Sequence, residues 1–239
     1  VEHPSTETNP YVYYSYFPKS AIREKNIIVG VWPHGGNMSN YDYEYHKNHA
    51  KNTLSWLSTF AETYKIPLIV VAIPRVDELY IHIIHPGTFS TTNEMYSRPD
   101  IKLIDAVWGQ YIPSLKEAGF ITNDKVFMMG FSSSGMFTHR FAMLHPEKIK
   151  GIWVGGDEAF PIPVEKLDGI RLDYALGTRN FESLTGKPFD WETYKLIPQF
   201  IVIGENDRLK NGILQDARDM WTYSEAAIMA ALRWKTCEA

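Results

Sequence analysis

The chain has 239 residues, of which 44% are hydrophobic and 22% charged, and its formal net charge is −4. This length suits one sizeable domain with its own core, and the composition is ordinary for a globular protein. The small negative charge gives no electrostatic reason to expect nucleic acid, and no apolar run approaches the roughly 20 residues that span a bilayer. Cys237 is the only cysteine, which excludes an internal disulfide and leaves the compartment open.

Short apolar segments alternate along the chain with longer segments that are apolar at helical spacing. In chain order we predict strand 11–17 near the sheet edge, strand 27–32, helix 47–64, strand 67–73, a long loop 76–100 with a short element at 79–84, helix 101–118, strand 126–129, helix 136–144, strand 149–155, an insertion or cap around 157–192, strand 199–203 and helix 215–233. Buried strands that alternate with amphipathic helices predict an α/β fold, with a mostly parallel central sheet and helices on both faces.

The most informative stretch is KVFMMGFSSSG at 125–135. Its apolar start predicts a strand buried on both faces, and the helical spacing after the turn stops before a proline, which ends a helix. A strand, a tight turn and a helix with Ser132 at the apex form the context of a nucleophile elbow. That turn requires small residues two positions before and two positions after the serine. Gly130 meets the requirement, and Ser134 stands where the G-x-S-x-G pattern has its second glycine.

Four segments resemble the α/β-hydrolase family, specifically its serine esterase and lipase-like branch. They are VWPHGGN at 31–37, MGFSSSGMF at 129–137, HPEKIKG at 145–151 and IVIGENDRL at 201–209. Each lies at the end of an expected strand or helix, in the order of the family. The resemblance implies a three-layer α/β-hydrolase fold that forms a single domain over 1–239, and hydrolysis of esters, amides or related acyl compounds.

The same resemblance implies the residues of a catalytic site. Ser132 would be the nucleophile, activated by an adjacent base. The backbone N–H of Ser133 would form one half of the oxyanion hole, and Gly36 or Asn37 the other half. His34 is interpreted as a residue that shapes the oxyanion loop rather than as the base. No metal ion and no organic cofactor is implied, because water completes the cycle of an acyl-enzyme.

The acid of the triad has several candidates in the sequence, and the base has none at the expected place. Asp207 follows the last predicted strand, where the family places its acid, with Glu205 and Asp216 as alternatives. The family order is Ser, acid, His, but no histidine follows Asp207, and the last one in the chain is His145. We therefore expect a C-terminally truncated chain that lacks the last strand of the fold and whose histidine lies beyond residue 239. Without that base, kcat should fall by a factor on the order of 10⁴ to 10⁶.

These residues predict a carboxylesterase-like serine hydrolase that acts through an acyl-enzyme on a small-molecule ester or acyl substrate. Two alternatives stay open. A peptidase or other amide hydrolase would use the same residues, and a non-catalytic binding protein would have lost the catalytic histidine. We expect neither a nucleic acid nor a membrane as a partner. Substrate and oligomeric state are not predicted, and a chain that begins with Val1 does not show whether a signal peptide was removed.

Two weaker patterns remain. The pairs HKNH at 46–49 and HIIH at 82–85 have the spacing of one helical turn, but a zinc site needs a third protein ligand. We interpret them as surface or loop histidines, some of which line the cleft. Tyr41, Tyr43 and Tyr45 alternate with other residues, and they either wall an acyl or aromatic pocket or form a half-buried extended segment.

Overall fold

The computed structural model describes residues 1–23, 25–34, 42–75, 84–156, 161–167 and 169–202. These residues contain a seven-stranded sheet with the order β1-β2-β4-β3-β5-β6-β9. Its strands are β1 (Glu2–His3), β2 (Tyr13–Tyr16), β3 (Gly30–His34), β4 (Leu68–Ala72), β5 (Val126–Phe131), β6 (Ile149–Gly155) and β9 (Gln199–Val202). β2 pairs antiparallel with β1 and β4, and the other neighbouring strands of the sheet pair in parallel. The predicted mostly parallel sheet is confirmed.

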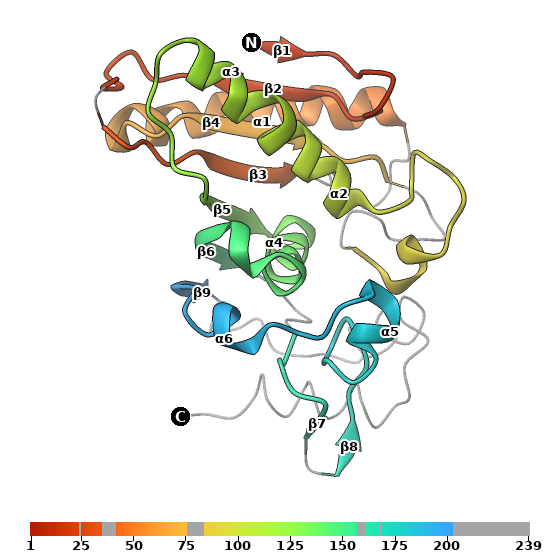
Figure 1. Cartoon of the computed structure of the whole chain (residues 1–239). Coiled ribbons are helices and arrows are strands. Elements are labelled where there is room, and N and C mark those ends of the chain that lie inside the picture. The colour runs from red at the N-terminus through yellow and green to blue at the C-terminus, as the bar shows by residue number, and fades with distance from the viewer. Residues whose placement is uncertain (24, 35–41, 76–83, 157–160, 168, 203–239) are drawn as a thin grey trace.

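Helices cover both faces of this sheet (Figure 1). The α-helices are α1 (Tyr43–Tyr64), α2 (Pro99–Ile104), α3 (Ile112–Glu117), α4 (Ser133–Leu144), α5 (Phe181–Thr185) and α6 (Trp191–Tyr194). Short 3₁₀ turns are η2 (Pro86–Phe89) and η4 (Pro146–Lys148), and the π-helical segment η3 (Asp105–Tyr111) joins α2 to α3. The helix predicted at 101–118 is thus a continuous helical segment that ends just before Gly119, whose φ is +83°.

The strand β4 explains why the core has two halves. Its five residues, LIVVA, are all fully or almost fully buried. Ile69 and Val71 pack into one cluster with α4 and η3, whereas Leu68, Val70 and Ala72 pack into the other with α1. Neighbouring side chains of a strand point to opposite faces, so a strand covered on both sides reads as one continuous apolar run. Burial of each large aliphatic side chain contributes about 1.5–3 kcal/mol.

The helix α1 begins earlier than the sequence predicts. The side chain of Asp42 caps it by accepting a hydrogen bond from the N–H of Glu44, at 3.0 Å. Tyr43 lies in its first turn, where its hydroxyl donates to the carbonyl of Ala72 and accepts from the N–H of Val12. The interpretation of these tyrosines as an extended segment is therefore wrong for Tyr43 and Tyr45, and Tyr41 lies outside the described residues.

The segment expected as an insertion or cap is described from residue 161 on, apart from residue 168. It contains α5, α6 and a small antiparallel pair, β7 (Lys166–Leu167) with β8 (Ile170–Arg171). Tyr174 and Phe181 of this segment belong to the core cluster of the sheet. That the segment closes over the site stays a prediction. The short element predicted at 79–84 and the helix predicted at 215–233 fall mostly or wholly outside the described residues.

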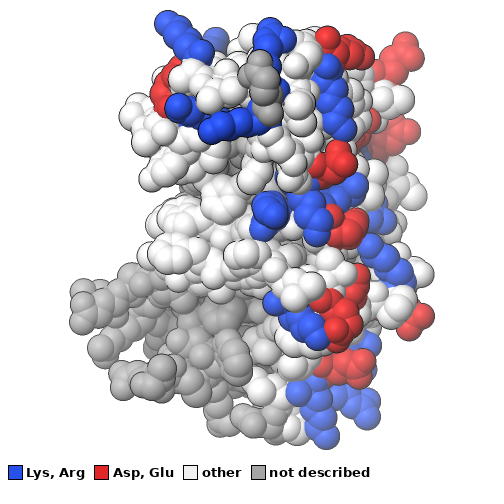
Figure 2. Space-filling view, turned by 60° about the vertical axis from the view of Figure 1, so that its left-hand side comes forward, with Lys and Arg blue, Asp and Glu red and all other residues white. Residues whose placement is uncertain are grey.

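The surface carries charges of both signs. On the face in Figure 2, acidic and basic side chains are intermingled along one side of the molecule, next to a broad uncharged area. Charges that alternate in this way do not add up to a strong field of one sign. None of the helices in the described ranges is both long enough and apolar enough to cross a membrane.

A buried ion-pair network joins the start of α2 to the end of α4. Arg98 donates two hydrogen bonds to the carboxylate of Asp100, at 3.0 and 2.7 Å, and His145 Nε2 donates a third at 2.8 Å. Burial raises the pKa of Asp100, but the hydrogen bonds and charges of His145 and Arg98 outweigh it, and the pKa falls to about 2. The network thus depends on an ionised carboxylate in the core.

The network should make the protein sensitive to acid. Because the pKa of Asp100 is lower in the folded chain, at about 2, than its ordinary 3.8, its contribution is complete above about pH 4 and is lost as the pH falls toward 2. The difference corresponds to about 2 kcal/mol in the free energy of unfolding. Urea unfolding across this range measures it. Asp100→Asn should be less stable at neutral pH and should show a shallower loss on acidification; an equally steep loss in both proteins would contradict the assignment.

Candidate active site

Ser132 lies at a sharp turn between β5 and α4. Its φ of 56° and ψ of −125° fall in a region that residues other than glycine rarely adopt, which costs on the order of 1–3 kcal/mol. The N–H of Ser132 donates to the carbonyl of Gly155 in β6, at 2.8 Å, which fixes the turn against the next strand. Its side chain is exposed, whereas Ser134 is buried. The turn therefore presents one serine hydroxyl to the outside at the start of a helix.

The turn is possible because Gly130 has no side chain. A Cβ atom at Gly130 would lie 2.1 Å from the carbonyl oxygen of Ser134 and 2.6 Å from the backbone nitrogen of Gly135. Gly135 in turn lies close to the sheet, since its Cβ would be 3.0 Å from the oxygen of Gly155. The close approach of two backbones thus explains the predicted need for a small residue at position 130, whereas the need for one at position 134 stays a prediction.

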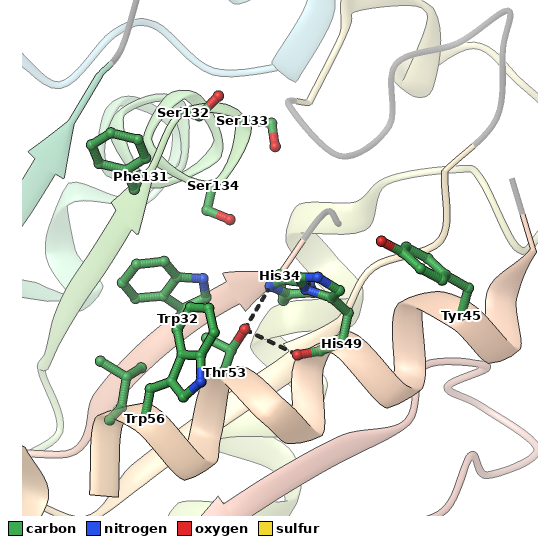
Figure 3. A pocket seen from close by; sticks show the side chains of 11 residues that line it. Trp32, His34, Tyr45, His49, Thr53, Trp56, Phe131, Ser132, Ser133 and Ser134 are labelled. Carbon is green, nitrogen blue, oxygen red and sulfur yellow. Dashed lines mark hydrogen bonds between the residues drawn. The ribbon is translucent and has the colours of Figure 1, made fainter. Parts of the chain in front are cut away.

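A pocket of about 520 Å³ adjoins this turn (Figure 3). Its lining comes from the end of β3, from one face of α1 and from the turn: Trp32, His34, Tyr45, His49, Thr53, Trp56, Leu57, Phe131, Ser132, Ser133 and Ser134. The α1 residues recur every three or four positions, so they lie on one side of the helix. In Figure 3, Ser132 and Ser133 lie at one end of the pocket and the histidine pair with Thr53 lies toward the other.

A chain of hydrogen bonds fixes the two histidines. Thr53 Oγ1 donates to the carbonyl of His49, at 3.0 Å, so it accepts from His34 Nδ1, at 3.3 Å. His34 Nε2 is then the acceptor for His49 Nδ1, at 3.1 Å, with the two rings only 15° from parallel. Burial, followed by the nearby His49 and His46, lowers the pKa of His34 to about 3. His34 is therefore neutral, and both of its nitrogens are engaged.

Only part of the predicted catalytic site falls on described residues. The structure brings Ser132 and Ser133 together at the pocket, and the first N–H groups of α4 have no acceptor within the helix. His34 ends β3 and is buried, in agreement with the interpretation that it is not the base. Gly36 and Asn37 lie outside the described residues. So do Asp207, Glu205 and Asp216.

Of the other described histidines, His139 and His145 are engaged away from the pocket. His139 Nε2 lies 3.1 Å from the hydroxyl of Tyr194, and His145 is bound to the buried Asp100. His46 is buried in α1 and His49 lines the pocket, so the interpretation of this pair as surface or loop histidines is wrong for His46. Within the described ranges, no group of three or more His, Cys, Asp or Glu is placed to hold a metal ion.

Sequence reasoning missed the wall that α1 contributes to the pocket. Tyr45, His49, Thr53 and Trp56 recur at the helical period, which was a usable signal. The predicted helix begins only at residue 47, so Tyr45 falls outside it and the pattern is not recognised as one face of a helix.

The topology of the sheet, its helices on both faces and the serine at the strand-to-helix turn define the α/β-hydrolase fold, and the predicted fold is confirmed. A solved structure of poly(aspartic acid) hydrolase-1 from Sphingomonas sp. KT-1 matches with a TM-score of 0.60 and 16% identity, over 98% of this chain and 79% of that one. A poly(3-hydroxybutyrate) depolymerase from Bordetella parapertussis matches with a TM-score of 0.52 and 14% identity, over 98% and 76%. No family model and no curated protein matches the sequence.

Proposed function

We propose that this protein is a serine hydrolase that cleaves carboxylic esters through an acyl-enzyme, with Ser132 as the nucleophile. One observation carries the proposal: Ser132 is held at a strained positive φ, exposed, in a turn that only a glycine at position 130 allows. Strain that the surrounding structure maintains is typical of functional positions. A buried hydrogen-bonded serine would need no such turn.

The geometry supports the following mechanism. The Oγ of Ser132 attacks the ester carbonyl carbon as a base takes its proton, and the carbonyl oxygen becomes an oxyanion. The N–H of Ser133 stabilises this oxyanion at the positive end of α4, a 12-residue helix, and Gly36 or Asn37 supplies the second donor. The alcohol leaves with the proton, and water then releases the acid from Ser132. Asp207 orients the imidazole of the base.

The similar structures support the general class of reaction. One is named a hydrolase and the other a depolymerase, and both share the fold of this chain. The pocket next to Ser132 has the size and the mostly apolar walls of a small-molecule site. The mixed surface charges in Figure 2 favour such a substrate over a nucleic acid.

Pre-steady-state kinetics test the proposal on the protein translated from the complete reading frame, which is called the full-length protein below. With para-nitrophenyl butyrate we expect a burst of one para-nitrophenol per protein molecule, followed by slower turnover, because acylation releases the alcohol before water regenerates Ser132. The matching para-nitroanilide distinguishes an esterase from an amide hydrolase, and the ester should react much faster. Turnover of neither compound, with no burst, would contradict the proposed function.

A further inference from the structure

We propose that the pocket beside Ser132 binds a hydroxylated aromatic group of the ester substrate, and that His49 accepts the hydrogen bond of its hydroxyl. This inference deepens the proposed function and rests on it for the position of the ester at Ser132. Three features of the pocket support it: aromatic walls, a fixed acceptor nitrogen and the placing of that nitrogen far from the serine.

Part of the pocket wall is aromatic. Trp32, Trp56 and Phe131 line the pocket, and they come from β3, from α1 and from the end of β5. Trp56 is 76% exposed and Phe131 is 57% exposed. Large exposed aromatic side chains that gather at a concave site favour a ligand with a flat apolar group, because they stack with it and lose water on binding.

The far end of the pocket presents a hydrogen-bond acceptor. The series of hydrogen bonds from Thr53 through His34 to His49 places the proton of His49 on Nδ1. In the neutral ring, Nε2 of His49 is then an acceptor, and it has no hydrogen-bond partner in the described part of the chain. His49 is only partly buried, and its ring lies 5.4 Å from that of Tyr45. A substrate group that reaches this nitrogen must therefore offer a donor.

The positions of Ser132, the aromatic walls and His49 in the pocket limit the class of substrate. In Figure 3, Ser132 and Ser133 lie at one end of the pocket, Trp32 lies beside the histidines toward the other end, and Ser134 lies between the two ends. A substrate whose ester lies at Ser132 and that enters the pocket thus reaches the space lined by Trp32 and the histidines. An aromatic ring with a hydroxyl on the side opposite the ester satisfies both requirements, because its ring is apolar and its hydroxyl donates. His49 is a specificity-determining residue in this account.

The test compares two esters that differ in one hydroxyl, methyl para-hydroxyphenylpropanoate and methyl phenylpropanoate. Because both compounds undergo the same reaction at the ester, a change in the ratio of their kcat/KM values reports a change in recognition of the hydroxyl. We expect the full-length protein to prefer the hydroxylated ester by about tenfold, the size of one neutral hydrogen bond. His49→Leu should bring the ratio near one. His49→Gln should retain part of the preference, because its amide oxygen still accepts, and Asn48→Leu on the exposed side of α1 should keep all of it.

Two results would overturn the inference: equal rates for both esters in the unchanged protein, or the same preference in His49→Leu. Measuring how tightly each ester binds, without hydrolysis, tests the pocket assignment separately from the proposed function. In Ser132→Ala, tryptophan fluorescence should report tighter binding of the hydroxylated ester, and the added His49→Leu change should remove the difference. That outcome supports the pocket assignment even where no ester is hydrolysed. Equal binding of both esters to Ser132→Ala would overturn the assignment.

Discussion

Replacement of Ser132 by alanine is expected to lower kcat for ester hydrolysis by a factor on the order of 10⁴ or more, with little change in KM. The reason is that the alanine variant keeps the pocket and the oxyanion donor but has no atom that forms the acyl-enzyme. Alanine also fits the space of serine, so the fold should be retained. Steady-state kinetics of the full-length protein with para-nitrophenyl butyrate measure the loss.

The neighbouring serine provides a matched control. Ser133→Ala removes a hydroxyl one residue away but keeps the backbone N–H that the proposed mechanism uses. We expect kcat to fall by less than about tenfold, since no side-chain role is assigned to Ser133. Comparable losses in both variants would indicate damage to the turn rather than removal of a nucleophile. Retained activity in Ser132→Ala would refute the mechanism.

Among single substitutions in the turn at Ser132, Gly130→Ala is expected to be the most destabilising. Its Cβ would lie 2.1 Å from the oxygen and 2.3 Å from the carbonyl carbon of Ser134. Both are backbone atoms at the start of α4, which packs on the sheet, so the clash cannot be relieved by rotation of a side chain. We expect the free energy of unfolding to fall by about 3 kcal/mol or more, and ester hydrolysis to be lost because Ser132 moves.

Gly151 in the adjacent strand β6 is the matched control. A Cβ there would lie 3.4 Å from the Phe127 ring and 3.4 Å from the oxygen of Pro198, which is close to ordinary contact. Gly151→Ala should therefore change the free energy of unfolding by less than about 1 kcal/mol. Urea unfolding of both variants makes the comparison. If Gly130→Ala and Gly151→Ala lower the free energy of unfolding by the same amount, the close approach at Gly130 does not determine the stability of the turn.

The parts of this fold that local sequence determines were predictable. The strand β6 has the bounds expected from its apolar run, and the turn at Ser132 follows from glycine and serine at fixed spacing. The buried network of Asp100 was not predictable, because His145, which binds the same carboxylate as Arg98, lies 45 residues from Asp100 in the sequence. The start of α1 was missed because a single cap at Asp42 determines it.

The candidate site likewise has a part that local sequence predicts and a part that depends on tertiary packing. The role of Ser132 was proposed from a local motif, whereas the pocket depends on how α1 packs against β3 and the turn, which no local pattern shows. The assignments of Gly36, Asn37 and Asp207 stay predictions. So does the expectation that the catalytic histidine lies beyond residue 239, and translation of the complete reading frame tests it directly. A stop codon directly after Ala239 would contradict that expectation.

The most direct test of the central claim is to treat the full-length protein with a fluorophosphonate and to locate the label. A fluorophosphonate reacts with a serine whose hydroxyl is activated by a base and whose oxyanion site is formed. Intact mass spectrometry should show one label per molecule, and peptide mapping should place it on Ser132, with no label in Ser132→Ala. An unlabelled protein, or a label on another residue, would contradict the account.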